Sequence, residues 1–179
     1  HWIKKLNKKV SGKEERILYG MTYELIKECV LDINGAIKFL KKLGYKTFYL
    51  IGGSTGASKI VVYHYYQQRN PVSKYVLIAG GDDLASYYRG FGRKKFLSIL
   101  KKCREEIKKG NGRELVPKDI VSDFLISYQS FYDTINPDGD YNVFPFYEHI
   151  NNLKLSKKSL FREFRSIDKP TLAIYGQLD

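Results

Sequence analysis

Helix-like and strand-like patterns of apolar residues alternate along the first half of the chain. Residues Leu6 to Leu18 are basic and polar, and they predict a loop. From Leu25 to Leu40 the apolar residues recur at steps of one, three and four, which predicts the buried stripe of an amphipathic helix. Gly44 stands where a glycine typically ends such a helix, after a last turn that contains two lysines.

Two short apolar runs predict buried strands with a helix between them. Thr47–Ile51 and Tyr75–Ala79 are rich in β-branched and aromatic residues, are too short for helices, and are each followed by a pair of glycines. Small residues and then bulky ones from Ala57 to Gln68 predict a helix, which Asn70-Pro71 ends. A strand, a helix and a strand in this order form a βαβ unit, so we expect the two strands to be parallel.

Helical patterns then replace strands over a long part of the chain. Phe96 to Ile107 predicts a basic amphipathic helix that ends at Gly110, and Pro117 predicts the start of another helix that extends to Phe131. The stretch from Ile135 to Asp168 is aromatic and irregular. Thr171–Tyr175 then predicts a third buried strand.

Together these elements predict an α/β fold with a mainly parallel sheet and an inserted helical cap. We assign residues 1–83 to the central part of the core, 84–168 to the cap, and 169–179 to the return of the chain to the core sheet. The cap should lie over the carboxyl-terminal ends of the strands. The chain starts at His1 and stops at Asp179, directly after a strand, so we expect it to be a piece of a longer protein.

The composition excludes several classes of protein. Hydrophobic residues make up 43% of the chain and aromatic residues 15%, which is typical of a folded domain rather than of a disordered chain. No apolar run reaches the roughly 20 residues that a membrane helix needs, so we expect no membrane span and a cytoplasmic location. Cys29 and Cys103 lie far apart in helical patterns, without the spacing of a zinc site or a disulfide framework, and we expect no metal.

The formal net charge of +12, from 31 Lys and Arg against 19 Asp and Glu, raises the question of nucleic-acid binding. The cations are scattered over predicted helix faces and helix ends, for example at Lys101-Lys102, and no nucleic-acid-binding motif accompanies them. We therefore interpret the charge as solvated surface and expect no nucleic-acid partner. A membrane surface or an acidic partner stays open.

The chemistry of the chain is concentrated in Gly52-Gly53-Ser54-Thr55-Gly56, which fits the pattern G-x-S-x-G between a predicted strand and a predicted helix. At this place Gly52 and Gly56 allow a turn sharp enough to expose the hydroxyl of Ser54 above the sheet. The N–H of Thr55, at the helix start, can then face the oxyanion that forms when Ser54 attacks a carbonyl. The alternatives are a glycine-rich turn without chemistry or a phosphate-binding loop.

From about residue 20 to its end the chain resembles the α/β-hydrolase superfamily in the order of its parts. After the first helix these parts are the run Tyr49–Ala57, the strand that ends at Gly80-Gly81-Asp82-Asp83, the helical cap and the run Pro170–Asp179. The resemblance implies an α/β-hydrolase fold, incomplete at both ends, with Ser54 as the nucleophile and Asp179, after the late strand, as the triad acid. Members of that family commonly have a histidine or an aromatic residue where this chain has Gly53.

A serine triad also needs a histidine that takes the proton of the nucleophile, and the resemblance places that histidine beyond Asp179. His64, in the helix behind Ser54, and His149, in the cap, are weaker candidates for this base. Asp82 and Asp83 are alternatives to Asp179 as the acid, and their ordinary role would be to cap the helix that follows them.

Aromatic residues of the cap could line an apolar acyl pocket, although aromatic side chains at helical spacing more often form a core. These residues are Tyr87, Tyr88, Phe91, Phe131, Tyr132, Phe144 and Phe146. The sequence assigns no one of them to a substrate.

The sequence thus predicts a serine hydrolase that acts on a carboxylic ester or a related acyl compound. Its partner would be a small-molecule acyl substrate, and neither a metal nor an organic cofactor is expected. The oligomeric state stays open. The alternative function, from another class, is a non-catalytic binding protein that retains the α/β-hydrolase scaffold, because a fold alone does not establish an activity.

Overall fold

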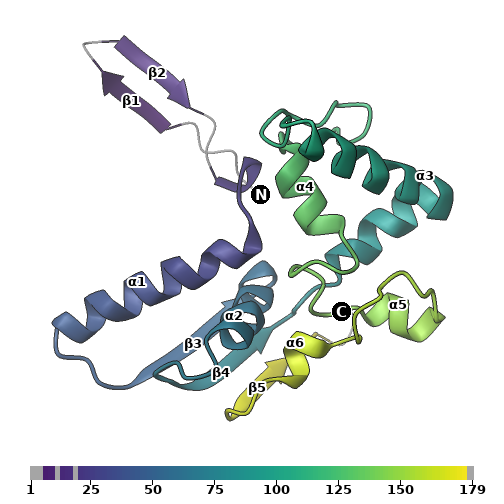
Figure 1. The fold of residues 1–179 in the computed structure, drawn as a ribbon. Helices are drawn as coiled ribbons and strands as arrows, with labels where there is room; N and C mark the ends of the chain where they lie inside the picture. Colours follow the sequence, from purple (N-terminus) through teal and green to yellow (C-terminus); the bar gives the residue numbers. More distant parts are fainter. Residues whose placement is uncertain (1–5, 11–12, 18–19, 177–179) are drawn as a thin grey trace.

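A three-stranded parallel sheet forms the centre of the computed structural model, which describes residues 6–10, 13–17 and 20–176. Its strands are β3 (Phe48–Gly53), β4 (Val72–Ile78) and β5 (Thr171–Ile174), in the order β3-β4-β5 (Figure 1). Both pairs are parallel, with Gly53 opposite Ile78 and Ile78 opposite Ile174. The α/β class and the three predicted parallel strands are confirmed. The burial predicted for Thr171–Tyr175 is wrong, because all four residues of the edge strand β5 are exposed.

Helix α2 (Thr55–Tyr66) connects β3 to β4 and is buried on almost every side. Val61, Val62 and Tyr63 are fully buried, because α2 packs on β3 and β4 with one side and on α1 (Cys29–Lys42) and α6 (Arg162–Arg165) with the others. A helix that is apolar around most of its circumference belongs inside a core. Helix α2 is therefore the central packing element of the sheet region.

The opposite face of the sheet is exposed in the described part of the chain. It presents five large apolar side chains to solvent, namely Tyr49, Ile51, Ile78, Leu172 and Ile174. Side chains alternate between the two faces of a strand, so Phe48, Tyr75 and Leu77 point to the α2 side and are buried.

The predicted first helix is confirmed with a modified start. A short 3-10 helix, η2 (Ile26–Glu28), precedes α1, and another, η1 (Gly20–Thr22), lies before it. The end of α1 is as predicted, because the N–H groups of Gly44 and Tyr45 bond back to the carbonyls of Lys41 and Leu40.

The loop expected from Leu6 to Leu18 is wrong for the residues described there. They form two antiparallel strands, β1 (Leu6–Val10) and β2 (Lys13–Ile17). The backbone register sets Lys8 opposite Glu15 and Lys9 opposite Glu14.

The residues between β4 and β5 form helices α3 (Asp83–Lys108), α4 (Tyr128–Ile135), α5 (Phe146–Asn151) and α6. Helix α3 bends at Gly92, and α3 and α4 lie beyond the end of the sheet from which β4 leads into α3 (Figure 1). Their facing residues make a second buried cluster, separate from the one around α2. Among the residues described, no helix is long and apolar enough to cross a membrane.

The helix predicted from Pro117 is wrong up to residue 127. Helix α4 starts only at Tyr128, where the Ser127 hydroxyl accepts a hydrogen bond from the N–H of Ser130. Upstream, the N–H of Val116 bonds to the carbonyl of Ile126, so the chain folds back on itself there. The loop buries its own apolar residues, and their spacing resembles a helical stripe.

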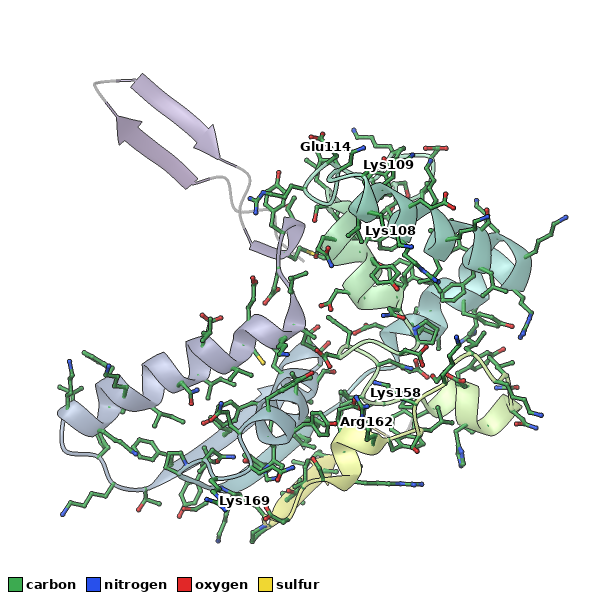
Figure 2. All side chains as sticks on the ribbon, viewed as in Figure 1. Lys108, Lys109, Glu114, Lys158, Arg162 and Lys169 are labelled. Carbon is green, nitrogen blue, oxygen red and sulfur yellow. The ribbon has the colours of Figure 1, made fainter. Side chains whose placement is uncertain are left out.

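A buried carboxylate, Glu163, fixes α6 to the preceding loop. Its Oε1 accepts hydrogen bonds from Lys158 Nζ at 3.0 Å and from Arg162 Nη2 at 2.7 Å, and both cations are labelled in Figure 2. Removing either partner would leave a buried charge less well compensated, which is costly.

Asp133 links α4 to the 3-10 helix η2. Its Oδ2 accepts a hydrogen bond from the N–H of Ile26 at 2.8 Å. Burial raises the pKa of Asp133 from 3.8 to about 6, against the opposite effect of that hydrogen bond. Between these pH values the folded chain holds a proton that the unfolded chain releases, so the folded state loses stability as the pH rises through this window.

We predict that Asp133→Asn gains stability relative to wild type as the pH rises from about 4 to 7, by about 2 kcal/mol, because an amide does not ionise. Urea denaturation at a series of pH values measures the difference. Asp32→Asn, at an exposed position of α1, is the matched control. A constant difference between Asp133→Asn and wild type across this range would contradict the prediction.

Candidate active site

Ser54 occupies a strained turn between β3 and α2. Its φ of 52° and ψ of −125° lie on the left-handed side, which side chains other than glycine rarely adopt. The turn is held on both sides, because the N–H of Ser54 donates to the carbonyl of Ile78 and its carbonyl accepts from the N–H of Ala57, both at 2.9 Å. Strain of this kind typically costs about 1–3 kcal/mol and persists only where the surroundings enforce it.

The backbones of β3 and α2 almost touch at Gly52. A Cβ atom at Gly52 would lie 2.4 Å from the carbonyl carbon and oxygen of Gly56, which is far inside van der Waals contact. A Cβ at Gly56 itself would meet nothing within 4 Å. Only Gly52, of these two predicted glycines, is therefore required by space.

The Ser54 side chain is exposed, and its hydroxyl makes no hydrogen bond to any residue that the structure describes. Thr55 is the first residue of α2, so its N–H has no partner inside the helix. A helix start also carries partial positive charge. Ser54 and Thr55 therefore provide an accessible hydroxyl beside an amide suited to an anionic oxygen.

Tyr141 joins this turn to the start of α3, and no sequence pattern indicated it. Its hydroxyl lies 3.3 Å from Thr55 Oγ1 and also hydrogen-bonds to Asp83. Burial raises the pKa of Asp83, and the hydrogen bond with Tyr141 lowers it in part. Tyr141 lies in the irregular segment between α4 and α5, where no periodicity or motif could have singled it out.

Asp82 performs a structural task at the start of α3. Its Oδ1 accepts from the N–H of Ala85 at 3.0 Å and its Oδ2 from the N–H of Tyr147 at 2.8 Å, so it caps α3 and fixes α5 to it. Burial raises the pKa of Asp82, and these two bonds lower it in part. Asp179, the predicted triad acid, lies outside the described residues.

His64 is buried in a hydrogen-bond network far along α2. Its Nε2 lies 3.1 Å from the carbonyl oxygen of Ser166, which can only accept, and its Nδ1 lies 3.0 Å from the Tyr75 hydroxyl. Burial lowers the pKa of His64, although the Ser166 carbonyl favours the charged form. Lys169 extends the network by donating to the backbone carbonyls of Asn70 and Val72 (Figure 2).

His149 is exposed on α5, and its ring meets that of Phe161 edge to face. Within the described ranges neither His149 nor His64 hydrogen-bonds to Ser54. Thr55 follows Ser54 directly in the chain, whereas no described histidine hydrogen-bonds to Ser54.

Two hollows lie at the carboxyl ends of β4 and β5. The larger has a volume of about 630 Å³ and is lined by Ala79, Gly80, Gly81, Asp82, Phe146, Ile150 and Tyr175. The smaller, of about 380 Å³, is lined by Leu77, Phe144, Phe146, Phe161, Phe164, Arg165, Ala173 and Tyr175. Ser54 lines neither hollow.

Five of the seven predicted cap aromatics belong to the cap core. Tyr87, Tyr88, Phe91, Phe131 and Tyr132 pack in the cluster of α3 and α4. Phe144 and Phe146 line the hollows instead.

A family model described as "Protein of unknown function (DUF1749)" matches residues 19–179. The chain belongs to the DUF1749 family. No curated protein and no solved structure matches it.

The two cysteines of this DUF1749 chain are not suited to act as nucleophiles. Burial raises the pKa of Cys29 and of Cys103 to about 12, so both thiols stay protonated at neutral pH. Across the described ranges, no group of three or more His, Cys, Asp or Glu side chains is placed to hold a metal ion.

The two glycines of the turn should respond differently to substitution in this DUF1749 protein. Gly52→Ala should destabilise the fold by about 2 kcal/mol or more, because the new Cβ forces β3 and α2 apart. Gly56→Ala, the matched control, has open space and should change the free energy of unfolding by less than about 1 kcal/mol. Urea denaturation of both variants measures this, and equal losses would contradict the close contact at Gly52.

Proposed function

We propose that this chain carries the nucleophile of a serine hydrolase, within an α/β-hydrolase fold, that acts on a carboxylic ester or a related small-molecule acyl compound. The observation that supports this most is the strained, exposed Ser54 between a parallel strand and a helix start. The surroundings hold a costly conformation at a G-x-S-x-G serine, and strain of this kind clusters at reactive residues.

In the proposed reaction Ser54 Oγ attacks the acyl carbon and loses its proton to a base. The N–H of Thr55 stabilises the negative charge on the carbonyl oxygen. The base then returns the proton to the leaving alcohol, and an acyl–Ser54 ester forms. Water releases the acid in the second half of the reaction and restores the Ser54 hydroxyl.

The base in this proposal is the histidine that the resemblance implies beyond Asp179, with Asp179 as the residue that orients it. His64 is unsuited to the role, because both of its ring nitrogens are engaged in the buried network. Asp83 is the alternative carboxylate, since Tyr141 connects it to Thr55.

A non-catalytic binding protein is the second candidate function. The feature that favours it is the Ser54 hydroxyl, which has no hydrogen-bond partner among the residues described, whereas an activated serine is bonded to its base. A fluorophosphonate probe separates the two functions, because it labels only an activated serine.

We predict that Ser54→Ala abolishes both fluorophosphonate labelling and hydrolysis of p-nitrophenyl esters by the intact protein, while its Tm stays near that of wild type. Ser54→Gly should also be inactive but more stable than Ser54→Ala by about 1 kcal/mol, because glycine adopts a positive φ without strain. Labelling and turnover that survive in Ser54→Ala would show that another residue is the nucleophile.

We also predict that Tyr141→Phe lowers kcat by about tenfold and leaves KM within about twofold, because it frees the Thr55 side chain beside the oxyanion position without touching bound substrate. Tyr63→Phe is the matched control, since it removes a tyrosine hydroxyl that bonds to Asn34 on the other side of α2. Steady-state kinetics measure both variants. An equal fall of kcat in the two would assign Tyr141 a general structural role.

A further inference from the structure

The two hollows are neighbours, because Phe146 and Tyr175 line both. We call them together the aromatic pocket. Its near end starts at Ala79, directly after Ile78, whose carbonyl holds the N–H of Ser54. The pocket therefore begins one residue from the contact that fixes the proposed nucleophile.

Aromatic rings form the walls of the aromatic pocket. Phe146 is the central ring, stacked on Phe144 with centroids 5.8 Å apart and meeting Phe161 at 5.5 Å and Tyr175 at 6.3 Å. The Tyr175 hydroxyl donates to the carbonyl of Gly80 at 3.2 Å, which directs the polar end of this ring to the backbone. The surface offered to a ligand is thus mainly apolar.

The polar groups of the pocket are largely engaged elsewhere. Asp82 is the ionisable side chain of the larger hollow, and each of its oxygens already accepts a backbone N–H. Arg165 lines the smaller hollow and is exposed, so it marks an outer edge. A charged ligand group would lose its hydration inside the pocket without gaining a partner.

One contact of the pocket, between Gly80 and Phe144, requires a glycine. A Cβ at Gly80 would lie 2.6 Å from the ring of Phe144, which is itself buried. A side chain at Gly80 would therefore clash with Phe144, which lines the smaller hollow. Phe146 and Ile150, by contrast, are 38% and 78% exposed, so they can be changed with little risk to the fold.

We propose that the aromatic pocket binds the acyl group of the substrate, and that this group is neutral, apolar and of medium length. This inference rests on the proposed function, because it needs an acyl group that is attacked by Ser54. A pocket of this size and lining recognises a ligand by the apolar area that it buries.

The first experiment compares p-nitrophenyl octanoate with p-nitrophenyl acetate as substrates of the intact protein. Wild type should prefer the octanoate by at least about tenfold in kcat/KM, because its longer chain buries more apolar area. Ile150→Asp should lower that preference, the ratio of the two kcat/KM values, by about fivefold or more. Leu31→Asp, at an equally exposed apolar position of α1 (74%), should keep the wild-type preference.

The second experiment measures binding without turnover, in the Ser54→Ala background. The neutral fluorophore N-phenyl-1-naphthylamine should bind, and octanoate amide should displace it. Adding Phe146→Ala should weaken fluorophore binding by about fivefold or more. Adding Phe39→Ala, which truncates an exposed phenylalanine on α1 (61%), should leave it unchanged.

The outcomes separate the two proposals. If turnover depends on Ser54 but wild type and Ile150→Asp show the same chain-length preference, the pocket does not bind the acyl group. The proposed hydrolase activity would not be affected by that result. Fluorophore binding that Phe146→Ala and Phe39→Ala affect equally also overturns the pocket. If octanoate amide binds in the pocket but the protein shows no turnover that depends on Ser54, the proposed class of ligand is supported and the proposed hydrolase activity is contradicted.

Discussion

The close approach of two backbones, at Gly52 in β3 and Gly56 in α2, is the contact on which the rest of the structure depends. It allows the chain to reverse from strand to helix within a few residues, and this reversal forces Ser54 into its positive φ. A side chain at Gly52 would push α2 away from the sheet. Because α2 is buried on almost every side, such a shift would disturb α1, α6 and the sheet together.

Helix α2 also couples the two ends of the sheet. Its first residue, Thr55, stands at the candidate site, while His64 near its end bonds to Tyr75 in β4 and to the Ser166 carbonyl just before β5. The two ring nitrogens of His64 thus both have polar partners, which explains a buried histidine without a catalytic role. The same network positions β5, and with it Tyr175 in the wall of the aromatic pocket.

The sequence predicted those parts of the fold and of the candidate site that are determined by residues close together in the chain. The strands and the turn at Ser54 were predictable because short apolar runs, glycine pairs and G-x-S-x-G all act within a few residues. Tyr141 and the capping bonds of Asp82 were not, because they join segments far apart in the sequence. The helix predicted from Pro117 was wrong for a related reason. Its apolar residues are buried in a loop, which the hydrogen bond from Val116 to Ile126 closes.

The charges around the turn explain how an anionic oxygen could be stabilised beside two aspartates. Asp82 and Asp83 both lie at the start of α3, where the partial positive charge of the helix and the backbone N–H groups of Ala85 and Tyr147 offset negative charge. The hydrogen bond from Tyr141 does the same for Asp83. The start of α2 has no acidic residue in its first turn, so the N–H of Thr55 keeps its positive character for a ligand. The two helix starts thus differ, since that of α3 offsets carboxylates of the chain, while in the proposed reaction that of α2 would stabilise the oxyanion.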